Sequence, residues 1–108
     1  MFKVNLELLE NEEVETVKAC NHFKGIESVG GKIFITNKRI AFKSHKGNIQ
    51  NNQLDINYDD IDEIGFYNTL GLVPNGMSIK TKSGNHEKFV VWGRKPLKKL
   101  IESKMDLQ

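Results

Sequence analysis

The chain of 108 residues contains one cysteine, Cys20, and only two prolines. A single cysteine excludes an intrachain disulfide, and a chain without disulfides is typical of a reducing compartment, so we expect a cytoplasmic protein. The N-terminal residues lack the basic stretch and apolar run of a secretory signal, and no segment approaches the roughly 20 apolar residues of a transmembrane helix. The formal net charge is only +2, which is too small to indicate nucleic-acid binding by itself.

The sequence instead contains repeated short alternations of apolar and polar residues. Its length predicts a single domain, residues 1–108, with enough surface buried on folding to form a core. Alternation with a period of two is typical of strands that are buried on one face. It predicts seven strands, at residues 13–23, 32–36, 39–45, 53–58, 61–67, 77–82 and 87–92.

A predicted hairpin at residues 32–45 shows the alternation most clearly. Ile33 and Ile35 share one face of the first strand, and Ile40 and Phe42 share one face of the second. Asn37 lies in the connecting turn, because asparagine tolerates a positive φ. The opposite faces carry Lys32, Phe34, Arg39, Ala41 and Lys43, so we expect a half-buried hairpin with a mostly basic outer side.

The period changes after Pro96, which suits the first turn of a helix because proline lacks the N–H that is unpaired there. Leu97, Leu100, Ile101 and Met105 then form one apolar stripe with helical spacing. The sequence therefore predicts a mainly β protein, a small barrel or sandwich of about seven antiparallel strands capped by a C-terminal α-helix.

Three stretches, taken in order, resemble the GRAM domain family, a branch of the pleckstrin-homology-like superfold. They are GGKIFITNKRIAFKS (30–44), NYDDIDEI (57–64) and NGMSIKTKSGNHEKFVVW (75–92). The resemblance covers roughly residues 14 to 104 and is similar to small bacterial members that contain little else. It implies two nearly orthogonal antiparallel sheets capped by the helix, and a binding module for anionic lipids, peptides or proteins.

Lipid-binding members of the superfold commonly carry a lysine in the first strand and a basic-x-Arg pattern at the start of the second. Lys18 and Lys24 match the first part of this pattern, whereas Phe34 stands where the arginine is expected. This departure from the family pattern disfavours a high-affinity inositol phosphate pocket.

Four lysines are candidate ligand-binding residues. In an up-and-down arrangement, loops 24–31 and 45–52 lie at the same end, which brings together Lys24, Lys32, Lys43 and Lys46. Several ammonium groups on one rim can hold an anionic headgroup or an acidic partner. The alternative is that these lysines only keep the sheet soluble and protect its edges. Lys38 and Arg39 belong to the other end, where we expect an ion pair with the acids of residues 59–63.

Other chemistry is poorly supported by the sequence. Cys20 and His22 share a strand face, but two ligands do not make a metal site, and no activating base for a cysteine nucleophile is apparent. We therefore expect no enzyme activity, metal or cofactor. Phe34 and Tyr67 are candidate stacking platforms for single-stranded nucleic acid, but basic residues are not interleaved with them, so we expect no nucleic acid.

The apolar stretch at residues 70–73 has two interpretations: it contacts a membrane or a partner, or it folds back and seals the barrel end, which we favour. The preferred function is a non-catalytic interaction module that docks a protein or peptide, including a second copy of itself. The alternative is peripheral binding to anionic lipid headgroups through the basic rim.

Overall fold

The computed structural model describes residues 5–45 and 53–107. Within these ranges the chain forms seven strands, a short 3-10 helix and one α-helix, which confirms the predicted elements and their order. They are β1 (Val14–Lys24), β2 (Glu27–Thr36), β3 (Arg39–Ser44), β4 (Gln53–Asn57), η1 (Tyr58–Asp60), β5 (Ile61–Thr69), β6 (Val73–Thr81), β7 (His86–Val90) and α1 (Arg94–Met105).

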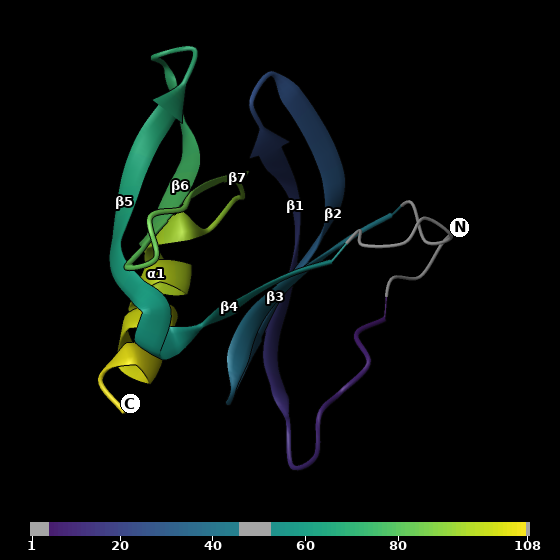
Figure 1. Cartoon of the computed structure of the whole chain (residues 1–108). Helices are drawn as coiled ribbons and strands as arrows, with labels where there is room; N and C mark the ends of the chain where they lie inside the picture. The colour runs from purple at the N-terminus through teal and green to yellow at the C-terminus, as the bar shows by residue number, and fades with distance from the viewer. Residues whose placement is uncertain (1–4, 46–52, 108) are drawn as a thin grey trace.

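The strands form one antiparallel sheet in the order β4-β3-β2-β1-β7-β6-β5. β1 joins two halves, because it pairs with β2 along its length and with β7 only over residues 21–23. Figure 1 shows β1–β4 on one side and β5–β7 with α1 on the other. The edge strands β4 and β5 are consecutive in the chain and are linked by η1.

The core lies between the two halves and is closed by α1, which packs beside η1, β5 and β6. Leu97 and Ile101 of the helix are buried, and Leu100 and Met105 pack partly buried against the same cluster, as the helical spacing predicted. The strands contribute apolar side chains from alternate positions, which is the pattern expected of a half-buried sheet. Prominent among them are Ile33, Ile35, Ile40, Phe42, Ile56, Ile64, Met77, Ile79 and Phe89.

The expected loop at residues 24–31 is wrong. β1 and β2 continue almost to the turn, so Lys24 pairs with Glu27 and only Gly25 and Ile26 connect the two strands. Gly25 has a φ of 60°, in the left-handed region that glycine adopts without a steric penalty. A two-residue turn therefore replaces a loop, and the β1–β2 hairpin extends beyond the neighbouring strands.

The expected basic outer side of the β2–β3 hairpin is also wrong, because residues 5–13, the N-terminal segment, cover much of it. Leu6 packs against Phe34 and Ala41, which are buried on this outer face. Arg39 is only 7% exposed, since its guanidinium forms an ion pair with Glu12 of the segment, with Nε 2.8 Å from Oε2. The aromatic ring of Phe34 is thus not available as a stacking platform.

The turn that follows β2 fastens the N-terminal segment. The Thr36 hydroxyl accepts hydrogen bonds from the N–H groups of Lys38 and Arg39 and donates to a carboxylate oxygen of Glu12 at 2.7 Å. Asn37 accepts from the Glu13 N–H and donates to the carbonyl of residue 11. The ion-pair partners expected for Arg39 at residues 59–63 are therefore wrong. Arg39 pairs instead with Glu12 of the N-terminal segment and with Asp55 of β4.

Candidate functional site

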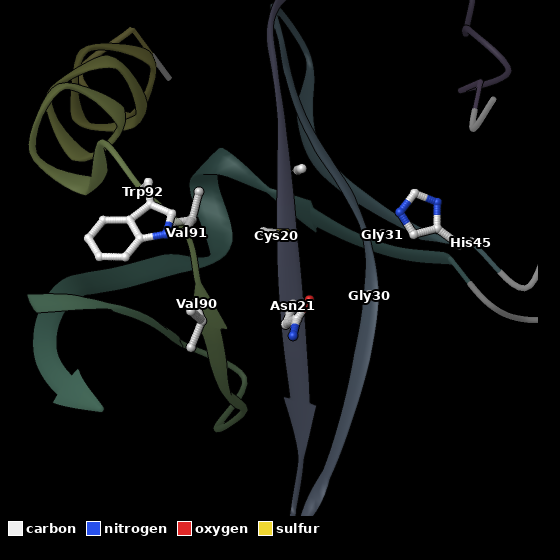
Figure 2. A pocket seen from close by; sticks show the side chains of 9 residues that line it. Cys20, Asn21, Gly30, Gly31, His45, Val90, Val91 and Trp92 are labelled. Atoms are coloured by element: carbon white, nitrogen blue, oxygen red, sulfur yellow. The ribbon is translucent and has the colours of Figure 1, made fainter. Parts of the chain in front are cut away.

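An open cleft with a volume of about 340 Å³ lies on the sheet where β1 separates from the end of β7. Figure 2 shows Asn21 of β1 in its middle, Trp92 on one side and His45 on the other. The cleft is lined by Ala19, Cys20, Asn21, Gly30, Gly31, His45, Val90, Val91 and Trp92. None of these lining residues is acidic, and two of them are adjacent glycines.

The two glycines have different roles. A Cβ on Gly31 would lie 2.2 Å from the carbonyl oxygen of Lys43, so the close approach of β2 and β3 requires glycine at this position. A Cβ on Gly30 would lie 3.4 Å from the Asn21 side chain and 3.6 Å from His45, which is ordinary contact. Packing therefore does not require glycine at position 30. The absence of a side chain at Gly30 keeps the cleft open.

Trp92 forms the other wall of the cleft and keeps an exposed fraction of 66%. It follows β7 and precedes Gly93, which has a φ of 75° and turns the chain into α1. The ammonium of Lys18 donates a hydrogen bond to the Trp92 carbonyl at 3.4 Å, which links β1 to this turn. The indole is thus placed by the fold at the point where the two halves of the sheet diverge.

The lysines predicted to form one rim are separated by the fold. Lys32 and Lys43 lie directly opposite each other on β2 and β3, in the row next to Gly31 and Ser44. Lys24 lies at the end of the β1–β2 hairpin, five strand positions from Lys32, or about 17 Å at the usual rise per residue. The structure therefore does not bring Lys24 into this group, because residues 27–31 are strand. Lys46 lies outside the described residues.

One of the two lysines beside the cleft already has a hydrogen-bond partner. The Lys43 ammonium donates a hydrogen bond to the backbone carbonyl of Asn5 at 2.8 Å, so the N-terminal segment reaches this row. Lys32 is half-buried and lies opposite Ala19 of β1, which lines the cleft. The two lysines thus place positive charge on the strands beside the cleft, although neither is among the residues that line it.

Cys20 and His22 are both buried in the core, although Cys20 also contributes to the lining of the cleft. Burial raises the pKa of the Cys20 thiol from 9.0 to about 12, which makes it a poor nucleophile. The His22 ring lies 4.9 Å from that of Phe89, and its Nε2 is 2.8 Å from a Glu87 carboxylate oxygen. Both residues therefore act as packed core groups in this fold.

The expected sealing role of residues 70–73 is wrong. Leu70 and Leu72 are 94% and 82% exposed in the turn between β5 and β6, which projects beyond the core instead of folding over it. Across residues 5–45 and 53–107, no helix has the length and apolar character to cross a membrane.

Comparison with known structures places the fold among pleckstrin-homology-like domains. The Vps36 N-terminal PH domain superposes with a TM-score of 0.72 at 18% identity, covering 93% of this chain and 83% of that chain. The C-terminal domain of an unknown protein from Leishmania infantum superposes with a TM-score of 0.76 at 20% identity, covering 89% and 86%. At such identities the likeness concerns the fold alone.

A match between the sequence and a family profile shows to which family the chain belongs. The profile of the GRAM domain family matches residues 1–95, and the chain therefore belongs to this family, as the three resembling stretches indicated. No curated protein matches the chain. GRAM and pleckstrin-homology-like domains are binding modules and are generally non-catalytic.

Sequence reasoning missed Asn21, Gly30 and Trp92 as site residues. Asn21 and Gly30 lie opposite each other in the β1–β2 register, and residue 90 lies on the other side of Asn21. The adjacent glycines were a signal in the sequence, since glycine in a strand often marks a close approach of backbones or of a ligand. The register that brings Trp92 near them was not visible in the sequence.

Proposed function

We propose that the chain is a non-catalytic module that docks an extended segment of a partner protein in the cleft beside β1. The observation that supports this most strongly is the combination of a largely exposed indole, Trp92, with a glycine floor at Gly30. Exposed tryptophan rings that can be covered by a partner are frequent binding hot spots. A floor without side chains lets a peptide backbone approach the sheet closely.

The charges beside the cleft indicate what kind of segment would bind there. Lys32 and Lys43 pair on β2 and β3 beside Gly31 of the cleft, and no acidic residue lines the cleft. We infer that the bound segment combines an apolar side chain, placed against Trp92, with an acidic one near the lysines. Complementary charge of this kind mainly sets specificity and the rate of association.

Anionic lipid is less well supported as the ligand of this site. Lys24 lies about 17 Å from Lys32 along the strand, and the Lys43 ammonium already binds a backbone carbonyl. A headgroup pocket needs several converging donors around a compact anion, whereas two lysines beside an open cleft suit an extended chain.

Selection from a random peptide library tests the proposal, with Trp92 as a built-in reporter because it is the only tryptophan. We expect selected peptides to shift its emission to the blue as the ring is covered. Gly30→Val places a side chain in the cleft at a position where a Cβ meets only the Asn21 and His45 side chains. It should weaken binding about tenfold or more, that is by at least about 1.4 kcal/mol. Lys82→Ala, on the exposed turn after β6, is the matched control and should bind normally.

Two outcomes would contradict the proposal. One is that the selected peptides bind Gly30→Val as tightly as the unmodified chain. The other is that no peptide is enriched while vesicles containing phosphatidylserine bind in a salt-sensitive manner that Lys32→Glu with Lys43→Glu abolishes. That second result would assign the lysine pair to anionic lipid instead.

A further inference from the structure

The first strand of the sheet has an open edge along its N-terminal part. β1 pairs with β2 from Val14 to Lys24, but β7 pairs with it only at residues 21–23. In the part of the chain that the structure describes, residues 14–20 therefore have no strand on the side away from β2. The backbone N–H and C=O groups along an open edge of this kind can pair with a strand from another chain.

The cleft lies where this edge opens. Cys20 and Val91 are 6% and 1% exposed, yet both line the cleft, so the cleft extends between β1 and the chain that leaves β7. Figure 2 shows Val91 and Trp92 on one side of this space and Cys20 on the other. The N–H of Val91 donates to the carbonyl of Asn75, so the backbone after β7 stays bonded to β6. A segment that enters the cleft thus meets the unpaired edge of β1.

The space between residues 14–20 and α1 is crossed by two long side chains. The ammonium of Lys18 donates to the carbonyl of Trp92, and that of Lys104 on α1 pairs with the carboxylate of Glu15 on β1. Lysine side chains are flexible, and contacts of this kind near the surface are typically worth less than about 1 kcal/mol. A strand that pairs with β1 can therefore displace both lysines at little cost.

The side chains on the outer face of this edge indicate which residues a partner strand would carry. Val17 is 44% exposed and offers an apolar contact, and Lys18 beside it reaches Trp92. Ala19 is exposed and lies opposite Lys32 of β2. A partner residue opposite Ala19 would lie two strand spacings, or about 10 Å, from the Lys32 backbone. The small Ala19 side chain leaves that path open, so an acidic residue there is within reach of the lysine.

We propose that the docked segment binds by strand addition, pairing antiparallel with β1 along residues 15–20 in line with the end of β7. This binding mode rests on the proposed docking function and specifies it. An antiparallel partner meets Ala19 before Val17, so its sequence should read acidic, any residue, apolar, in that order from its N-terminus. In strand addition the backbone hydrogen bonds supply affinity and the alternate side chains supply specificity.

Backbone methylation of a peptide enriched from the random library tests this mode, because it removes single N–H donors without changing any side chain. Methylation at every second position, where the N–H points to β1, should weaken binding about tenfold or more. At the intervening positions, where the N–H points to solvent, the loss should be less than about twofold.

Hydrogen exchange followed by NMR reports on the chain itself. The peptide should slow exchange about tenfold or more at the alternate amides of residues 15–20 that point away from β2. The amides of β4, which is also an edge strand, are the matched control and should be unchanged. Lys32→Ala should weaken binding of an acidic peptide up to about fivefold. Lys24→Ala, at the far end of the hairpin, should bind as the unmodified chain does.

The outcomes separate strand addition from docking as such. Alternation in both the methylation series and the exchange data would support strand addition. A peptide that shifts the emission of Trp92 without either alternation would overturn strand addition and leave the docking function intact. Enrichment of no peptide would overturn both.

Discussion

The buried ion pair between Glu12 and Arg39 makes a quantitative prediction about stability and pH. Glu12 is 5% exposed, and hydrogen bonds from Arg39 lower the pKa of its carboxyl group from 4.5 to about 2. Burial opposes this shift, and hydrogen bonds from the Leu9 N–H and the Thr36 hydroxyl add to it. The difference between these pKa values corresponds to roughly 3 kcal/mol of folding free energy. Removing one partner of a buried ion pair typically costs about 3–5 kcal/mol, which is consistent.

The sign of the pH dependence follows from the lowered pKa. The folded protein holds the Glu12 proton less tightly than the unfolded chain, so this stabilisation is complete above the unfolded pKa of 4.5 and is lost as the pH falls towards 2. We expect Glu12→Gln to reduce the free energy of unfolding by roughly 3 kcal/mol near neutral pH, and by much less at about pH 2.

Urea unfolding at several pH values measures this effect. If Glu12→Gln does not fold, the double variant with Arg39→Gln removes both charges and should be more stable than Arg39→Gln alone, which leaves the Glu12 carboxylate buried without its guanidinium partner. A loss below about 1 kcal/mol for Glu12→Gln, or a loss that is the same at every pH, would refute the role assigned to the pair.

Three further predictions concern the core and the sheet. Gly31→Ala should lower the free energy of unfolding in urea by about 1–3 kcal/mol because the new Cβ meets the Lys43 carbonyl, while Gly30→Ala should lower it little. Equal effects of the two variants would contradict the register described. Leu97→Ala should cost about 2–5 kcal/mol, and a loss below about 1 kcal/mol would mean that α1 does not close the core. Cys20 should react with iodoacetamide far more slowly in the folded protein than in urea, and equal rates would contradict its burial.

The sequence predicts the strands and the helix well because each signal is local. Alternation along a single strand is visible without knowledge of its neighbours, and the stripe from Leu97 to Met105 needs only the helical period. Both were confirmed, since Leu97 and Ile101 are buried against the sheet. The family resemblance was likewise carried by contiguous stretches that the family profile matches.

Features that depend on contacts between distant segments were not predictable in this way. Glu12 lies 27 residues from Arg39, and nothing in the local sequence distinguishes it from the other acids of the N-terminal segment. The distance between Lys24 and Lys32 was likewise not predictable, because it depends on whether residues 27–31 form a loop or continue the strand. The left-handed Gly25 decides this in favour of strand, which separates Lys24 from Lys32.

The exposed turn at Leu70 shows a different limit. Apolar residues in a sequence indicate burial, and the sealing interpretation followed that rule. The structure has a tight turn with a left-handed leucine, which leaves the side chains of Leu70 and Leu72 in solvent. Composition alone does not separate an apolar turn that closes a core from one that meets a ligand, because both lower the exposed apolar area in the final state.

The most direct test of the docking cleft is a titration of Trp92 fluorescence with a selected peptide, run in parallel with the peptide's own anisotropy. The account predicts that both signals change with the same dissociation constant, and that Gly30→Val weakens both together. Peptide binding that changes the anisotropy while the emission of Trp92 stays the same would place the partner elsewhere on the molecule and contradict the central claim.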